Sequence, residues 1–152
     1  MVEYCLANET DFFGIMRILI ATGIYPPDVG GPATWSQLIR EGFLGRRHEV
    51  GVLPYREVRK FPKGISHFVY LLKLLHRSRS ADLILLTDTI SCGLPVWLSG
   101  RKYVLKVGGD YVWEQALQRW GVADLLDEFL KKKYSWKIEL LRYLQSRVAR
   151  GA

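Results

Sequence analysis

Short apolar runs rich in β-branched residues alternate along this chain with longer stretches in which apolar positions recur at helical spacing. The short runs predict strands buried on both faces of a parallel sheet, and the longer stretches predict helices that cover it. We therefore expect a single α/β domain, a Rossmann-like three-layer sandwich with a mostly parallel sheet and its first strand in the centre. Strands are expected at 17–22, 49–53, 83–87 and 103–107.

Helices are expected between and after these strands. The first runs from about Ala33 to Leu44 after an irregular loop over 23–32, and a short one covers 91–99. The stretch 111–150 has a helical pattern throughout. In the helix that follows the second strand, one apolar face is expected to pack on the sheet, formed by Ile65, Phe68, Leu71, Leu72 and Leu75.

The composition supports a folded domain and removes several classes of protein. With 152 residues, 49% of them hydrophobic, the chain is long enough to bury one core. Two cysteines far apart exclude a disulfide framework and a structural zinc site, and the histidines lack the spacing of metal ligands, so we expect neither a metal nor a resident cofactor. No apolar run reaches the ~20 residues that span a bilayer, which predicts a cytoplasmic protein, at most peripheral to the inner face of the membrane.

The formal net charge is +7, and the basic residues concentrate in two segments. Segments 56–79 and 131–150 each hold seven Lys or Arg residues against one acidic residue. Such segments suit an anionic partner, meaning a phosphate, an acidic lipid or a nucleic acid, but they are equally typical of solvated helix faces. Since no helix-turn-helix, RRM or KH signature is present, nucleic acid is the least favoured partner.

Three loops follow strands of the expected sheet, at 23–32, 88–91 and 108–111, and ligands of open α/β sheets bind at this edge. Gly30 and Gly31 precede a helix, where backbone N–H groups and the helix dipole favour a phosphate. The same glycines could serve only a tight turn, since neither a GxGxxG nor a GxxxxGK[ST] motif is present.

Polar residues gather around the last of these loops. Lys106, Asp110 and Glu114 lie at the end of a strand and the start of a helix, and Asp88 follows the third strand. Each aspartate could bind a sugar hydroxyl or cap the helix after it, and position alone favours the cap. No GxSxG serine and no cysteine with a suitable histidine indicates hydrolase chemistry.

Three segments together resemble the N-terminal domain of family-four, GT-B fold glycosyltransferases: MRILIATGIYPPDVGGPATW, RRHEVGVLP and KVGGDYVWE. The likeness covers roughly Met16 to the end, and YPPDVGG at Tyr25 to Gly31 is its most specific part. It implies a retaining enzyme that moves a sugar from a nucleotide-sugar donor to the hydroxyl of a glycan or lipid-linked acceptor. It also implies that Gly30 and Gly31 approach the donor diphosphate.

The remaining site residues follow from the same resemblance. Many members carry a histidine where this chain has Gly108-Gly109-Asp110, so Asp110 is expected to take the catalytic position. Asp88, Lys106 and Glu114 are expected to contact the acceptor or the sugar. Members that act on lipid-linked acceptors dock on acidic membranes, which implies a membrane-facing surface formed by Lys131, Lys132, Lys133 and Trp136.

The resemblance also bears on domain organisation. Residues 1–15 are expected to be an N-terminal extension, and 16–152 an acceptor-side domain that ends before its last strand and before the donor-binding domain. The chain alone is then expected to be inactive, and to need a separate donor-domain chain or to self-associate through Ile138, Leu141, Leu144 and Val148. The alternative is a flavodoxin-like module that binds a phosphate or a nucleotide without catalysis.

Overall fold

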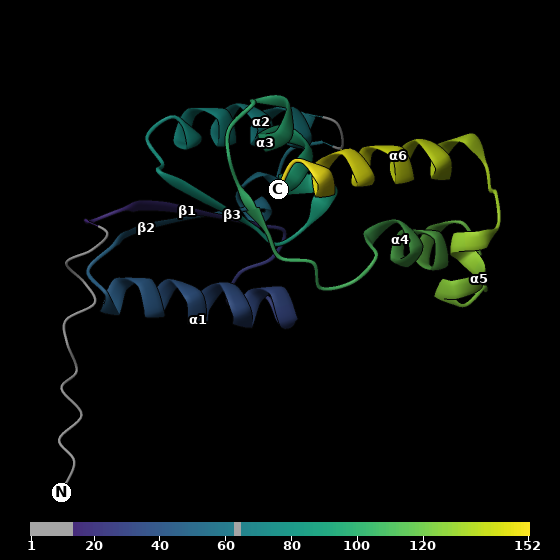
Figure 1. Ribbon diagram of the computed structural model, residues 1–152, viewed down its shortest axis with the longest axis horizontal. Coiled ribbons are helices and arrows are strands. Elements are labelled where there is room, and N and C mark those ends of the chain that lie inside the picture. Colours follow the sequence, from purple (N-terminus) through teal and green to yellow (C-terminus); the bar gives the residue numbers. More distant parts are fainter. Residues whose placement is uncertain (1–13, 63–64) are drawn as a thin grey trace, which may run out of the picture.

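Four parallel strands form the sheet in the order β2–β1–β3–β4 in the computed structural model, which describes residues 14–62 and 65–152 (Figure 1). β1 pairs in parallel with both β2 and β3, so the expected parallel sheet with an interior first strand is confirmed. The strands are β1 Arg17–Thr22, β2 Glu49–Pro54, β3 Leu83–Leu86 and β4 Val104–Leu105.

β4 is shorter than the expected strand at 103–107, and the residue before it, Tyr103, contributes its side chain to the core. Tyr103 is buried, and its hydroxyl donates a hydrogen bond of 2.6 Å to the carbonyl of Val148. A buried phenol requires such a partner. This contact fixes the end of the last helix over the edge of the sheet.

Helices cover both faces of the sheet, which confirms the three-layer α/β sandwich (Figure 1). α1 (Gly31–Gly45) lies on one face, and α2 (Ile65–Ser78), α3 (Leu94–Leu98) and α6 (Trp136–Arg150) lie on the other. α4 (Tyr111–Arg119) and α5 (Leu126–Lys131) lie beside the sheet, next to α6. A 3₁₀ turn follows β2 at Tyr55–Val58, and a π-helical turn follows β3 at Thr89–Gly93. None of the helices within the described residues is long and apolar enough to cross a membrane.

The core has three parts that correspond to these layers. Ile18, Ile20 and Leu85 face α1, while the alternate residues of the same strands face α2, α3 and α6. Such alternation is what a strand buried on both faces requires. A separate cluster joins α4, α5 and α6 and consists of Val112, Ala116, Phe129 and Ile138.

The prediction of which face of α2 packs on the sheet is wrong. The buried residues of α2 are Ser66, Tyr70, Leu74 and Ser78, whereas Ile65, Phe68 and Leu72 are each more than half exposed and Leu71 and Leu75 are half-buried. Polar positions can turn inward here because each finds a partner: the Tyr70 hydroxyl donates to the carbonyl of Leu53, and the Ser78 hydroxyl donates to that of Leu75.

Two of the expected helical stretches differ from a single regular α-helix. The stretch 111–150 forms three helices instead of one, because Gly121 adopts a φ of 64° after α4 and the chain is extended at Lys132 and Ser135 after α5. The stretch 91–99 is helical as expected, but it starts within the π turn that precedes α3, where the Asp88 carboxylate accepts the N–H groups of Ser91 and Cys92. Local polar contacts therefore set these boundaries.

The expectation that Ile138, Leu141, Leu144 and Val148 lack intramolecular partners is also wrong. Ile138 and Val148 are buried, Leu141 packs against the α4–α5 cluster, and Leu144 is half-buried. The exposed stripe of α6 lies on its other side and consists of Trp136, Leu140 and Tyr143. Residues 1–13 of the expected N-terminal extension lie outside the described residues.

We predict that Gly93→Ala destabilises the protein. A Cβ at this position would lie 2.7 Å from Val148 Cγ1 and 3.1 Å from the Asp88 carbonyl oxygen, so either α6 or the π turn must shift. Overpacking of this kind costs about 1–3 kcal/mol in the free energy of unfolding, measurable by chemical denaturation. Gly45→Ala is the control, since a Cβ there meets no atom within 4 Å; an equal loss in both variants would contradict the packing argument.

Candidate functional site

A cleft of about 310 Å³ opens at the carboxyl edge of the sheet, where the loops after β1, β3 and β4 meet. It brings together Gly31, Asp88, Lys106 and Glu114, four residues that the sequence placed at a common site. Parallel strands carry their ligands at this edge because loops and helix N-termini converge there. The complete lining is Gly31, Pro32, Thr87, Asp88, Thr89, Lys106, Val107, Gly108, Gly109, Tyr111 and Glu114.

The two glycines at the start of α1 have different roles. Gly30 has a φ of 155°, and a Cβ there would lie 2.7 Å from Ile24 Cδ1, so this residue shapes the loop and does not line the cleft. Gly31 lines the cleft, and a Cβ there would meet no atom within 4 Å. A side chain at residue 31 would therefore extend into open space beside the site without disturbing the loop.

The N-terminus of α1 offers one free donor. Ala33 and Thr34 both donate their N–H groups to the carbonyl of Gly30, and Pro32 has no N–H. The N–H of Gly31 has no acceptor within the described part of the chain. Unpaired N–H groups and the dipole of this 15-residue helix favour an anion at the cleft.

Among the described residues that line the cleft, Lys106 alone carries an ammonium group. Its Nζ lies 5.3 Å from the centroid of the Trp35 ring on α1 and beside Gly108, and none of the ion pairs between described residues includes it. A cation over an aromatic face keeps its charge while its orientation is fixed. The side chain is thus held near α1 with its charge available to a ligand.

The two aspartates act as helix caps in the structure. Asp88 Oδ1 accepts hydrogen bonds from the N–H groups of Ser91 (2.6 Å) and Cys92 (3.2 Å). Asp110 Oδ1 accepts one of 2.9 Å from the N–H of Trp113 at the start of α4. Asp88 lines the cleft, whereas Asp110, expected at the catalytic position, lies next to the cleft residue Gly109 but is not part of the lining.

Glu114 and Tyr111 extend from the first turn of α4 toward the same loop. The Glu114 carboxylate approaches Gly109 so closely that a side chain at residue 109 would collide with it. Burial raises the pKa of the Tyr111 phenol, which stays neutral at physiological pH and keeps its O–H as a donor. The cleft therefore holds hydrogen-bond acceptors and donors in addition to one cation.

Thr87 and Thr89 also line the cleft, and neither was singled out from the sequence. Thr87 Oγ1 donates to Thr22 Oγ1 (2.9 Å), which donates to the carbonyl of Ile24 (2.7 Å), so this pair joins the loops after β3 and β1. Thr89 is buried, and its hydroxyl has no partner among the described residues. One feature of the sequence could have identified both threonines as site residues: they lie at the end of the third apolar run, where a loop at the carboxyl edge of the sheet begins.

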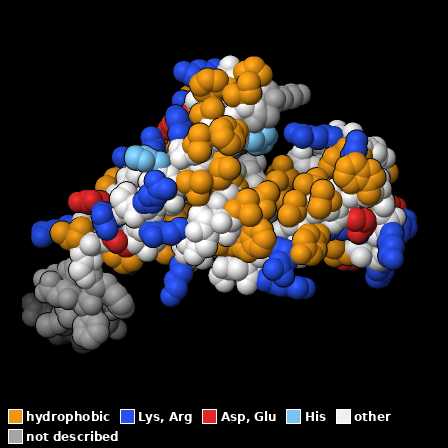
Figure 2. Space-filling view, turned by 90° about the horizontal axis from the view of Figure 1, so that it is seen from above, with side chains coloured by type: hydrophobic (Ala, Val, Ile, Leu, Met, Phe, Trp, Pro, Cys, Tyr) orange, Lys and Arg blue, Asp and Glu red, His pale blue; other side chains and the backbone are white. Residues whose placement is uncertain are grey.

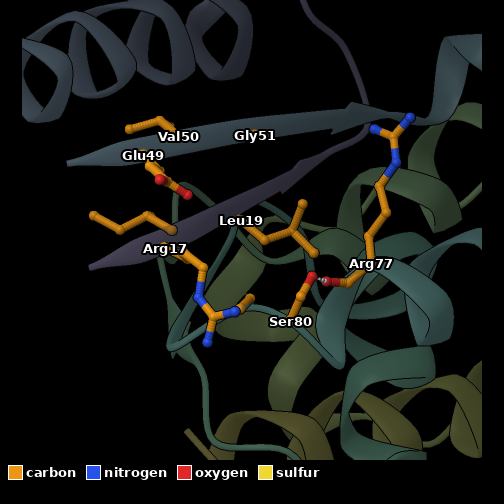
Figure 3. Close-up of a pocket in the computed structure, with 9 residues that line it drawn as sticks. Arg17, Leu19, Glu49, Val50, Gly51, Arg77 and Ser80 are labelled. Carbon is orange, nitrogen blue, oxygen red and sulfur yellow. Dashed lines mark hydrogen bonds between the residues drawn. The ribbon is translucent and has the colours of Figure 1, made fainter. Parts of the chain in front are cut away.

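A larger cavity, of about 420 Å³, lies at the opposite end of the strands (Figure 3). It is lined by the first residues of β1 and β2 together with Arg77 and Ser80. Its two cations are already engaged: Arg17 bonds to Asp82 at 2.9 Å, and Arg77 donates to the carbonyl of Val52 at 3.0 Å. With its cations engaged and its place at the amino ends of β1 and β2, it is the weaker candidate.

The residues expected to face a membrane are all exposed, but the three lysines differ in whether their charge is paired within the protein. Lys132 is neutralised by Asp124 at 2.6 Å, a pairing that raises the pKa of Lys132 and lowers that of Asp124. Lys131 and Lys133 are exposed, and Trp136 is 71% exposed. Lys132 therefore links the end of α5 to Asp124 in the loop before it, while Lys131, Lys133 and Trp136 are accessible to a partner.

Comparisons with protein-family models, with curated proteins and with solved structures return no match to this chain. Among residues 14–62 and 65–152, no group of three or more His, Cys, Asp or Glu side chains could hold a metal ion.

We predict that Asp110→Ala lowers the free energy of unfolding by about 1 kcal/mol, because the N–H of Trp113 loses its capping acceptor. Asp110→Asn should restore most of that stability, since an asparagine oxygen caps a helix equally well. Thermal and chemical denaturation of both variants measure this. If the asparagine variant were as unstable as the alanine variant, the charge of Asp110 and not its hydrogen bond would stabilise α4.

Proposed function

We propose that the cleft binds the diphosphate and sugar of a nucleotide-sugar donor, and that the chain is the acceptor-side domain of a retaining glycosyltransferase. The observation that carries the proposal is the meeting of a free N–H at the start of α1 with an unpaired Lys106 ammonium in one cleft. The ammonium supplies a full positive charge and the N–H a partial positive charge, and both attract the negative oxygens of a diphosphate. The resemblance in the YPPDVGG loop points to the same ligand.

In sugar transfer, negative charge grows on the departing diphosphate. Donors that already point at that oxygen stabilise the transition state more than the ground state, because they need no reorganisation during the reaction. Gly31 N–H and Lys106 would take this role. The carboxylates of Asp88 and Glu114 would accept hydrogen bonds from sugar or acceptor hydroxyls, and Asp110 would hold the first turn of α4 that carries Glu114.

A binding module without catalysis is the second candidate. The observation in its favour is that Asp110, expected at the catalytic position, caps α4 through Oδ1 and is absent from the cleft lining. Such a module would bind UDP and UDP-glucose equally, since only the nucleotide and phosphate would be recognised. A glycosyltransferase domain should bind the sugar conjugate more tightly.

The test is a titration of the 152-residue chain with UDP-glucose, followed by amide NMR shifts. We expect shifts at Gly31, Lys106 and the neighbouring loops, and we expect Gly31→Trp to weaken binding by at least tenfold because the indole would occupy the cleft. Its fold should be unchanged, since residue 31 faces open space.

Gly42→Trp on the same helix is the matched control, because a Cβ there also meets no atom within 4 Å and residue 42 lies outside the cleft lining. Equal binding by the Gly31→Trp and Gly42→Trp variants would reject the cleft as the binding site. Turnover of UDP-glucose by the chain alone is not expected, since in the family that it resembles the donor is held mainly by a second domain.

We further propose that one surface of the chain docks on an anionic membrane. Exposed large hydrophobic side chains gather over α2 and over α3 and α6, with Lys and Arg around them (Figure 2). We call this surface the α2–α6 face, after its two exposed stripes: Ile65, Phe68 and Leu72 on α2, and Trp136, Leu140 and Tyr143 on α6. α3 lies between the two helices and contacts both.

The positive charge of the α2–α6 face favours an anionic lipid surface as its partner over a second copy of the chain. α2, α3 and α6 contain a single acidic residue, Glu139, which is paired with Arg142 at 3.0 Å. On α2, Lys73 and Arg77 pair with Glu57 of the neighbouring 3₁₀ turn, whereas Lys137, Arg147 and Arg150 of α6 are in none of the ion pairs between described residues. Two copies docked through this face would therefore bring unpaired cations against each other. An anionic bilayer attracts them instead, by about 1 kcal/mol per basic residue, and accepts the exposed Trp and Tyr at its interface.

We predict that the chain sediments with vesicles containing phosphatidylglycerol but not with vesicles of phosphatidylcholine alone, and that high salt weakens the association. The double variant Phe68→Ser, Leu72→Ser should lose at least about tenfold in binding because it removes apolar area from the contact. Leu38→Ser is the control, since Leu38 is 62% exposed on α1, on the other face of the sheet. Equal losses in both, or a dimer that forms without lipid, would reject the proposal.

A further inference from the structure

The turn after β3 contains an uncommon backbone arrangement at the edge of the cleft. Thr89–Gly93 forms a single π-helical turn, closed by a hydrogen bond of 3.1 Å from the N–H of Gly93 to the carbonyl of Asp88. The Asp88 carboxylate caps its start, and Gly93 lets Val148 of α6 approach its end. Such turns are rare, and they occur frequently at functional sites. The first residue of this turn, Thr89, lines the cleft.

Thr89 combines burial with an unused hydroxyl. The residue is 8% exposed, its Oγ1 is closed to solvent, and Oγ1 has no hydrogen-bond partner within the described part of the chain. The nearby Thr22 shows the ordinary situation: it is fully buried, accepts from Thr87 and donates to the carbonyl of Ile24. Buried hydroxyls almost always have such partners, so the exception at Thr89 calls for an acceptor or donor that the chain itself does not supply.

We infer that Thr89 is a ligand-binding residue, whose hydroxyl bonds to a hydroxyl group of the sugar that the diphosphate carries. This inference rests on the proposed diphosphate site. Gly31 and Lys106 supply a donor N–H and a cation, which suit phosphate oxygens, whereas a threonine hydroxyl both donates and accepts, as a sugar hydroxyl does. Because Oγ1 is closed to solvent in the free protein, it must turn to reach the ligand, and a rotation of about 120° around χ1 exchanges the hydroxyl with the methyl group while the backbone stays fixed.

The experiment compares UDP-glucose with UDP in NMR titrations of the wild type, Thr89→Val and Thr89→Ser. Valine keeps the shape and removes the hydroxyl. We expect Thr89→Val to weaken UDP-glucose binding by about three- to tenfold, to leave UDP binding unchanged, and to be rescued by Thr89→Ser. The melting temperature of Thr89→Val should be equal to or above that of the wild type, whereas Thr22→Val, which breaks two hydrogen bonds, should lower it.

The outcomes separate the inference from the proposed function. Wild-type binding of UDP-glucose that Thr89→Val leaves unchanged would overturn the role of Thr89 and leave the diphosphate site standing. An equal loss for UDP and UDP-glucose would overturn the assignment of the hydroxyl to the sugar. Absence of binding of either probe to the wild type would overturn the proposed function and the role of Thr89 together.

Discussion

The carboxylate of Asp88 makes the contact on which the rest of this structure depends. By accepting the N–H groups of Ser91 and Cys92, it turns the chain sharply at the end of β3 and forms the π turn. Cys92 then contacts the hydroxyl of Tyr70 on α2, and Gly93 packs against α6. One cap therefore joins the sheet to two covering helices and places the turn at the edge of the cleft.

This arrangement explains how the cleft acquires chemistry that no single motif supplies. The loop after β1 brings Gly31, the π turn brings Thr89, and the loop after β4 brings Lys106. The Thr22–Thr87 hydrogen bond ties the first two loops together, and the contact of Lys106 with Trp35 ties the third to α1. The binding groups are thus positioned by contacts made in the free protein, which reduces the ordering required when a ligand binds.

The sequence was a reliable guide where a run of residues is buried on both faces. β1 and β3 were placed within one residue of their bounds because short apolar runs such as ILIA and LILL, with turn residues after them, are typical of strands in a covered sheet. It failed at α2, where Tyr70 and two serines occupy the buried face because their hydroxyls find carbonyl partners or a neighbouring phenol. It also missed the break at Gly121, since a positive φ is invisible in hydrophobic spacing.

The candidate site shows the same division. Topology alone placed Gly31, Asp88, Lys106 and Glu114 at one edge, because parallel strands end together. Whether Asp110 caps a helix or faces a ligand depends on one hydrogen bond to Trp113, and the unpartnered hydroxyl of Thr89 depends on the packing around the π turn. The cap is a local contact that the position of Asp110 in the sequence already favoured, whereas the packing around Thr89 is a tertiary detail that neighbouring residues do not encode.

The most direct test of the account is a crystal structure of the chain soaked with a nucleotide sugar. The account predicts electron density at the carboxyl edge, with the diphosphate between the N-terminus of α1 and the Lys106 ammonium and with the sugar next to the π turn. Density in the cavity beside Arg17 and Arg77 at the opposite end of the strands, with the carboxyl-edge cleft empty, would contradict it.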